Sequence, residues 1–253
     1  MSKNIFFELH HNLPREGPGN NESTRKAFEM LAELPSDACI LDIGCGPGMQ
    51  TIQLAKLTNG TITAVDTHEP FLTEVKQRAV ADGLGERILP RKASMFTLPF
   101  DNHSFDVIWS EGSIYIMGFE QGLKAWRPFL KPGGYLAVSE LAWLDNHPPT
   151  EAAEFWEKNY PGMKTVEDHL RAVEQSGYIL IGHFVLPESG WWDDYYLPME
   201  QRILALRETY RNDTACLGQL DEAQQEIDLF RKYSNYYGYV FYVMQAAVST
   251  YRT

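Results

Sequence analysis

The sequence has no long hydrophobic run. No stretch approaches the roughly 20 apolar residues that a membrane-spanning helix needs, and the first residues contain no apolar core of the kind found in signal peptides. We therefore predict a cytoplasmic protein with no membrane partner.

The sequence has few cysteines, and its acidic residues outnumber its basic ones. Cys39, Cys45 and Cys216 are odd in number and follow no C-x-x-C spacing, which argues against a disulfide framework and against a zinc site. Carboxylates and histidines do not cluster at ligand spacing either, so no metal is predicted.

The formal net charge is −12, which works against affinity for phosphate backbones. We predict no nucleic-acid partner.

The sequence does contain a regular alternation of two patterns. From Ala38 onward, short apolar runs alternate with segments of helical periodicity. Apolar runs without polar alternation are typical of parallel strands buried on both faces. Strands that alternate with helices form right-handed crossovers and place helices on both faces of a sheet. The expected strands are 39–43, 61–65, 87–93, 106–110 and 135–139, and the expected helices are 48–57, 70–82 and 119–130.

This pattern predicts an α/β fold with a doubly wound, mostly parallel sheet and one domain with additions. Ser23 precedes a helical pattern that ends at Pro35, which indicates an early helix. Two further strands are expected at 178–186 and 239–244, and the segment between them is too long for a hairpin loop and has helical periodicity. We therefore divide the chain into an N-terminal cap helix (1–37), a core (38–186), a helical lid insertion (187–232) and a final strand (233–253).

The strongest local motif is the loop from Asp42 to Gly48, which reads D-I-G-C-G-P-G after the first predicted strand. Glycine allows a positive φ and lets a ligand approach where a Cβ would clash. One glycine would indicate only a turn, whereas three alternating glycines behind an acidic residue favour ligand binding. The spacing departs from the dinucleotide motif G-x-G-x-x-G because Met49 occupies the third glycine position, and no P-loop lysine follows.

Asp66 ends the second predicted strand, where a carboxylate can accept hydrogen bonds from both hydroxyls of a ribose. Alone it is a weak signal, because aspartates at strand ends also cap helices. Together, the glycine loop and Asp66 predict a cofactor that contains a nucleoside. They leave S-adenosylmethionine and NAD as alternatives.

From Ala38 to Ser139 the sequence resembles the class I S-adenosylmethionine-dependent methyltransferases. The segment from Trp109 to Tyr115 is similar to the W-S-E-G-x-I-Y segment of small-molecule methyltransferases of the ubiquinone-biosynthesis-like group. The resemblance implies a Rossmann-like methyltransferase fold with seven strands, an antiparallel last strand, S-adenosylmethionine as cofactor and a small-molecule acceptor. Five family motifs occur in order: D-x-G-x-G-x-G at Asp42 to Gly48, the ribose ligand at Asp66, L-P-F at Leu98 to Phe100, F-D-x-I at Phe105 to Ile108, and L-K-P-G-G at Leu130 to Gly134.

The resemblance also implies which residues bind the cofactor. Many relatives carry an aspartate before the L-P-F motif, where this chain has Ser94 and Met95, so we expect their hydroxyl and amide to bind adenine more weakly. The predicted cofactor-binding residues are Asp42, Gly44, Cys45, Gly46, Gly48, Asp66, Thr67, Ser94, Met95, Ser110, Glu111 and Tyr115.

Methyl transfer requires little acid–base chemistry, because the sulfonium is already activated and the enzyme mainly aligns the acceptor and removes water. Glu111 is the catalytic candidate, since a carboxylate near the sulfonium can steady the cation, hold an amine or accept a proton. The alternative, to which we give equal weight, is that Glu111 is a capping or solvated carboxylate with no part in the reaction. The aromatic residues of the lid are candidates for the substrate site through their ring faces, although packing against the sheet is the favoured alternative. They are Trp191, Trp192, Tyr195 and Tyr196.

Two other functions stay open. An NAD(P)-dependent oxidoreductase is the first, because the glycine loop is close to the dinucleotide motif. A non-catalytic module that binds S-adenosylmethionine is the second, and the long insertion at 187–232 argues against it.

Overall fold

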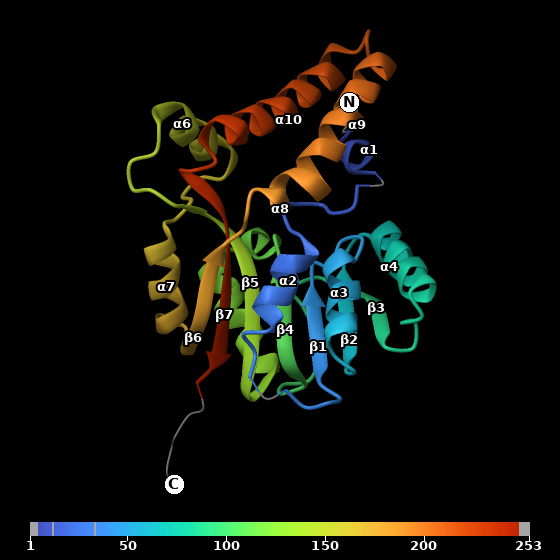
Figure 1. The fold of residues 1–253 in the computed structure, drawn as a ribbon, viewed down its shortest axis with the longest axis vertical. Coiled ribbons are helices and arrows are strands. Elements are labelled where there is room, and N and C mark those ends of the chain that lie inside the picture. The colour runs from blue at the N-terminus through green and yellow to red at the C-terminus, as the bar shows by residue number, and fades with distance from the viewer. Residues whose placement is uncertain (1–4, 12, 33, 248–253) are drawn as a thin grey trace.

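The computed structural model describes residues 5–11, 13–32 and 34–247, and its centre is one seven-stranded sheet (Figure 1). The strand order is β3-β2-β1-β4-β5-β7-β6. Strand β7 runs antiparallel to β5 and β6, and the other neighbouring pairs are parallel. The predicted fold class is confirmed. The strands are β1 (Cys39–Ile43), β2 (Thr61–Asp66), β3 (Ile88–Lys92), β4 (Phe105–Glu111), β5 (Leu130–Trp143), β6 (Tyr178–Val185) and β7 (Tyr237–Ala246).

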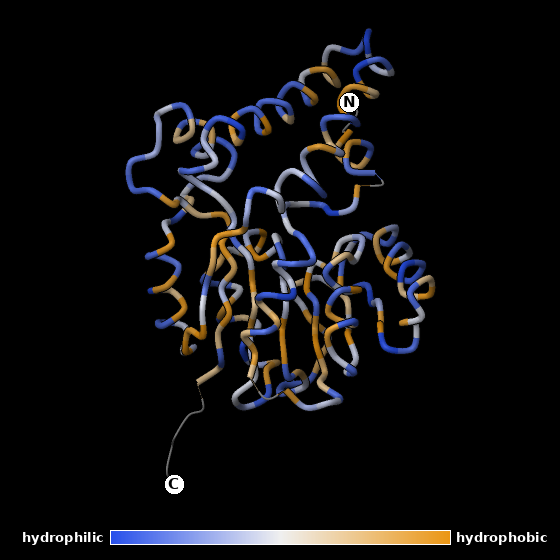
Figure 2. The backbone as a smooth tube through the Cα atoms, viewed as in Figure 1, coloured by the Kyte–Doolittle hydropathy of each residue, from blue (hydrophilic) through white to orange (hydrophobic). Residues whose placement is uncertain are grey.

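The central strands are buried on both faces, which explains their uninterrupted apolar runs. In β1, Ile40 packs into a core on one face and Leu41 into a core on the other. The edge strand β6 instead has one buried residue, Tyr178, and its other residues are half-buried or exposed. The tube coloured by hydropathy shows the hydrophobic colour along the inner strands (Figure 2).

Helices cover the two faces of the sheet. The first face is covered by α2 (Asn21–Phe28), α3 (Met49–Leu57) and α4 (Glu69–Ala81), which share one hydrophobic core. The second face is covered by α5 (Phe119–Trp126) and α7 (Val166–Gln175). Crossover helices on both faces are what right-handed connections between parallel strands require.

The cap helix α2 does not have the predicted bounds. It begins at Asn21 and ends at Phe28, well before Pro35. Asn20 is the N-cap residue, and its side-chain oxygen accepts a hydrogen bond of 2.8 Å from the Ser23 amide. Asparagine and serine are equally good caps, so Ser23 was a plausible but wrong choice. A short helix that sequence reasoning missed, α1 (Phe6–His10), precedes it.

The segment after β6 is helical, as predicted. It forms α8 (Ser189–Trp191), a π-helical turn at Trp192–Tyr196, α9 (Leu197–Thr209) and α10 (Thr214–Tyr233). Together with α1 and α6 (Thr150–Asn159), these helices enclose a separate hydrophobic core beyond the carboxyl ends of the strands (Figure 1). The proposed boundaries of the lid stay a prediction. None of the helices among the described residues is long and apolar enough to cross a membrane.

Candidate active site

The glycine loop follows β1 and takes a left-handed backbone conformation three times, with φ of 69°, 51° and 89° at Gly44, Gly46 and Gly48. A Cβ on Gly44 would lie 2.4 Å from Ser113 Oγ, and a Cβ on Gly48 would lie 2.7 Å from Val75 Cγ2. A Cβ on Gly46 would meet only the flexible Glu16 side chain, at 3.4 Å. Gly44 and Gly48 are therefore required for packing, whereas Gly46 is the glycine at which the backbone is open to a ligand.

A cavity of about 400 Å³, here called the glycine-loop cavity, lies at the carboxyl ends of β1, β2 and β4. This is where doubly wound sheets bind ligands. Most of the predicted cofactor residues line it, namely Gly44, Cys45, Gly46, Asp66, Thr67, Ser94, Met95, Glu111 and Tyr115. Residues that sequence reasoning missed also contribute, including Phe7, Arg15, Glu16 and His68.

Asp66 joins the end of β2 to the glycine loop. Its Oδ2 accepts a hydrogen bond of 3.1 Å from the Gly46 amide, and its Oδ1 accepts one of 2.8 Å from the His68 amide. These bonds fix the carboxylate on the cavity wall, and each oxygen keeps a further lone pair for a ligand hydroxyl.

Three predicted cofactor residues do not line the cavity: Asp42, Gly48 and Ser110. Asp42 is fully buried, and its Oδ2 accepts a hydrogen bond of 2.5 Å from Thr51 Oγ1. Burial raises the pKa of the Asp42 carboxyl to about 7. Ser110 shares a hydrogen bond of 2.7 Å with Ser113, which in turn donates to the Ile43 carbonyl. Asp42 and Ser110 thus stabilise the glycine loop and the strand ends through hydrogen bonds, without lining the cavity.

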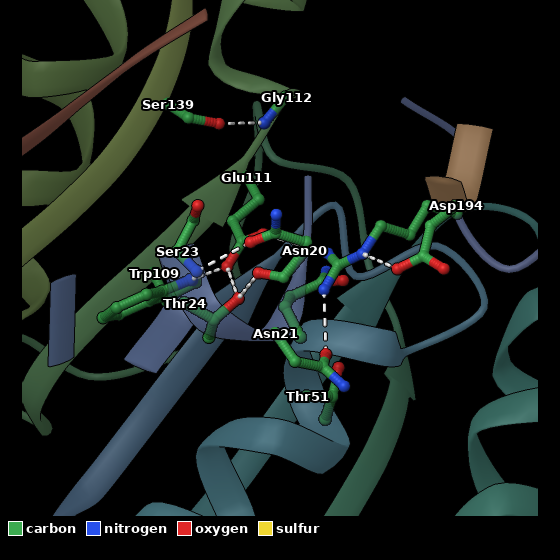
Figure 3. Close-up of polar contacts among 12 residues, drawn as sticks. Asn20, Asn21, Ser23, Thr24, Thr51, Trp109, Glu111, Gly112, Ser139 and Asp194 are labelled. Atoms are coloured by element: carbon green, nitrogen blue, oxygen red, sulfur yellow. Dashed lines mark hydrogen bonds and ion pairs between the residues drawn. The ribbon is translucent and has the colours of Figure 1, made fainter. Parts of the chain in front are cut away.

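Glu111 is held by three donors at the end of β4 (Figure 3). Its Oε1 accepts hydrogen bonds from Thr24 Oγ1 at 2.7 Å and from Trp109 Nε1 at 2.9 Å. Its Oε2 forms an ion pair with Arg15 at 3.0 Å. Through these contacts the carboxylate anchors the N-terminal segment over the sheet, a role that differs from the capping or solvated carboxylate weighed as the alternative. The catalytic role of Glu111 stays a prediction.

The N-terminal segment that Glu111 anchors separates the glycine-loop cavity from a second one of about 520 Å³, here called the aromatic cavity. The turn residues Glu16, Gly17 and Pro18 line both, and so does Tyr115. The R-E-G-P-G turn sequence before α2 was the available signal for this segment, because glycine and proline mark a reversal of the chain.

The structure divides the four aromatic residues proposed for the substrate site. Trp191 and Tyr195 line the aromatic cavity, whereas Trp192 and Tyr196 do not. Tyr196 is fully buried and donates a hydrogen bond of 2.9 Å to Glu226. Trp191 also stacks on Phe230 with ring centroids 4.1 Å apart. This side chain therefore both packs against a neighbouring ring and lines the cavity.

Residues 40–134 match the model of a family described as a methyltransferase domain. This segment is similar to a methyltransferase domain. The match includes the glycine loop, Asp66 and Glu111, the residue of β4 that lines the cavity, and it supports the predicted enzyme class for this part of the chain. The family depends on S-adenosylmethionine, the cofactor that the sequence resemblance implied.

Curated relatives of this domain match part of the chain. Methyltransferase GfsG from Streptomyces halstedii is 29% identical over 119 residues, which cover 47% of this chain and 42% of that protein. The 27-O-demethylrifamycin SV methyltransferase of Amycolatopsis mediterranei is 28% identical over 149 residues, which cover 57% and 55%. The chain therefore aligns with about half the length of these proteins.

A solved structure extends the likeness of the fold to nearly the whole chain. It is a methyltransferase from Geobacter sulfurreducens in complex with S-adenosyl-L-homocysteine. The TM-score is 0.82 at 19% identity, and the alignment covers 96% of this chain and 98% of that one. The methyltransferase fold therefore includes the helices outside residues 40–134.

The residues of the glycine-loop cavity fit S-adenosylmethionine. Burial, together with the nearby Glu74 and Asp66 carboxylates, raises the pKa of the Glu16 carboxyl to about 8. The Glu16 Oε2 atom is buried and accepts no hydrogen bond within the described residues. A cationic sulfonium or ammonium in the cavity would favour the ionised form of this carboxyl. The Asp66 carboxylate at the same wall has lone pairs that would accept hydrogen bonds from ribose hydroxyls.

Proposed function

We propose that this chain is an S-adenosylmethionine-dependent methyltransferase that acts on a small-molecule acceptor. The observation that carries the proposal is the pair of adjoining cavities with a shared wall at Glu16, Gly17, Pro18 and Tyr115. One cavity is built on the glycine loop of the methyltransferase domain, and the other is enclosed by aromatic side chains. A donor and an acceptor held side by side are what a transfer reaction needs.

Within this proposal, the glycine-loop cavity binds the cofactor. Asp66 accepts hydrogen bonds from the ribose, Ser94 and Met95 bind the adenine, and Glu16 offsets positive charge. Bound S-adenosylmethionine supplies an activated methyl group, so the protein needs no nucleophile of its own. The finer assignment to the ubiquinone-biosynthesis-like group rests on the W-S-E-G-x-I-Y resemblance alone.

The aromatic cavity holds the acceptor and excludes water from it. Its rim is formed by the N-terminal segment and by helices α8 to α10, which form the proposed lid. Exclusion of water strengthens electrostatic interactions within the cavity and prevents side reactions. The size of about 520 Å³ is in the range of cavities that hold small organic ligands and is far too small for a folded protein or a nucleic-acid duplex.

Parallel titrations with S-adenosyl-L-homocysteine and with NADH test the proposal against its main alternative. Intrinsic tryptophan fluorescence provides a readout, because Trp109 on β4 donates a hydrogen bond to Glu111 in the wall of the glycine-loop cavity. We expect saturable binding of S-adenosyl-L-homocysteine and no saturation with NADH. Saturation with NADH alone would establish the oxidoreductase instead. Binding of S-adenosyl-L-homocysteine without methylation of any component of a metabolite extract would support the non-catalytic module.

A further inference from the structure

The ionisable groups of the aromatic cavity are of one sign. Glu16, Glu140, Glu222 and Glu226 line it, and among the described residues neither lysine nor arginine does. The ring of His10 also lines it, but burial lowers the pKa of this histidine and favours its neutral form. The cavity therefore offers several acceptors of positive charge and no counter-charge of its own.

One of these carboxyl groups has an unused acceptor. Glu140 is on β5 and is 0% exposed, and its Oε1 accepts a hydrogen bond of 2.9 Å from the Leu141 amide. Its Oε2 is buried and accepts no hydrogen bond of normal geometry within the described residues, and the neighbouring Tyr160 phenol only partly lowers the pKa that burial raises. A buried acceptor without a donor is costly. Burial also raises the pKa of the Glu140 carboxyl to about 8. A cation in the cavity would donate a hydrogen bond to Oε2 and would stabilise the ionised carboxylate.

The walls around this carboxyl are aromatic. Tyr115 and Tyr160 lie edge to face with ring centroids 6.0 Å apart, and Trp191 lies 5.4 Å from Tyr239. Burial and the neighbouring Glu140 raise the pKa of the Tyr160 phenol above its usual value, so this ring stays neutral. The faces of neutral aromatic rings attract cations, and the attraction grows when water is excluded.

We propose that the aromatic cavity binds an acceptor that carries a positively charged nitrogen, an organic ammonium. The charge lies against Glu140 and Glu226, and the carbon skeleton lies against the rings of Trp191, Tyr160 and Tyr239. This inference rests on the proposed function, because the cavity is the acceptor site only if the glycine-loop cavity holds the methyl donor. Glu222 is paired with Lys158 at 3.8 Å, but a carboxylate or phosphate ligand would still meet Glu16, Glu140 and Glu226, which have no ion-pair partner among the described residues.

Three probes of similar size and different charge test the inference: 2-phenylethylamine, 2-phenylethanol and phenylacetate. Binding is measured by calorimetry on the full chain at saturating S-adenosyl-L-homocysteine, so that the glycine-loop cavity is already filled. We expect the amine to bind about tenfold more tightly than the alcohol, as one desolvated cation–π or charge-assisted contact would give. No binding of phenylacetate is expected. Equal or tighter binding of the alcohol or the anion overturns the inference.

Two variants connect the preference to the carboxyls. Glu140→Gln keeps the size of the side chain and the acceptor for the Leu141 amide, and it should reduce the preference for the amine over the alcohol about fivefold or more. Glu157→Gln removes an exposed carboxylate of α6 that does not line the cavity, and it should leave the preference unchanged. If Glu140→Gln fails to fold, Glu226→Gln replaces it. An undiminished preference in a folded cavity variant overturns the inference.

The failure of this inference is distinguishable from that of the proposed function. The saturating step itself reports whether S-adenosyl-L-homocysteine binds. If it binds and the amine shows no preference, the cofactor assignment stands and the ammonium acceptor is wrong. If it does not bind, the proposed function is wrong, and the inference about its acceptor falls with it.

Discussion

The guanidinium of Arg15 and the carboxylate of Glu111 form an ion pair of 3.0 Å between residues 96 positions apart in the chain. The side chains are 5% and 4% exposed. Thr24 on α2 donates a hydrogen bond to the same carboxylate. Glu111 therefore links both the turn before α2 and α2 itself to the end of β4. The wall between the two cavities is therefore attached to the sheet through Glu111.

Loss of this ion pair should loosen the wall. Arg15→Ala leaves the Glu111 carboxylate buried without its cation, and breaking a buried pair in this way costs about 3–5 kcal/mol. We expect a lower free energy of unfolding in denaturant titrations and faster dissociation of S-adenosyl-L-homocysteine in stopped-flow experiments. Arg25→Ala, at an exposed position of α2, is the control. Wild-type stability and dissociation in Arg15→Ala would mean that the pair does not hold the segment.

Asp66→Ala should weaken cofactor binding by about 1–3 kcal/mol, because ribose hydroxyls lose a charged acceptor. The change also removes the acceptor of the Gly46 amide and so loosens the glycine loop. Calorimetric titration with S-adenosyl-L-homocysteine measures the effect, with Asp101→Ala at an exposed loop position as the control. An unchanged dissociation constant in folded Asp66→Ala would remove Asp66 from the site.

Two glycines of the same loop should respond differently to substitution. Gly46→Val places a branched side chain at the cavity and, at a φ of 51°, also strains the loop; it should abolish cofactor binding, while circular dichroism still shows the fold. Gly48→Ala combines a φ of 89° with a clash at Val75, and such backbone strain costs about 1–3 kcal/mol. It should therefore lower the melting temperature. Tight cofactor binding by Gly46→Val would show that the loop is only structural.

Filling the aromatic cavity should separate acceptor methylation from cofactor binding. Ala223 on α10 lines this cavity and does not line the glycine-loop cavity. Ala223→Trp should leave the affinity for S-adenosyl-L-homocysteine within a few-fold of the original and abolish methyl transfer. Ala205→Trp, at an exposed position of α9, is the matched control. Normal methylation by Ala223→Trp would place the acceptor elsewhere.

Glu140 should also make stability depend on pH. Burial raises the pKa of its carboxyl from 4.5 to about 8, so the folded protein binds this proton more tightly than the unfolded chain. Its contribution to stability is complete below pH 4.5 and is lost as the pH rises through 8. Thermal melts of Glu140→Gln should therefore decline less between pH 5 and pH 8 than those of the original protein. Parallel declines would show that Glu140 does not titrate in this range.

The alternating strands and helices of the sheet could be predicted from the sequence. Strand β1 has the predicted bounds because buried parallel strands are continuous apolar runs that end at a glycine turn. The start of α2 was misplaced because Asn20 and Ser23 are equally good caps, and a local pattern cannot choose between them.

The candidate site was predictable where it is local and not where it is assembled from distant segments. The glycine loop and Asp66 are motifs, and the structure brings them to one cavity. The Arg15 contact with Glu111 joins an N-terminal turn to a strand end, and no local pattern indicates such a pair. Glu140 was hidden because it lies within an apolar strand, where its burial depends on the packing of α6 and β7 around it.

The central claim is that a methyl group passes from the glycine-loop cavity to a small molecule in the aromatic cavity. Incubation of the full chain with S-adenosylmethionine carrying an isotopically labelled methyl group and with a metabolite extract tests it most directly. The account predicts the label in a small-molecule fraction, absent when Ala223→Trp replaces the original protein and present with Ala205→Trp. Label only in the protein or nucleic-acid fraction, or no label from a chain that binds the cofactor, would contradict the account.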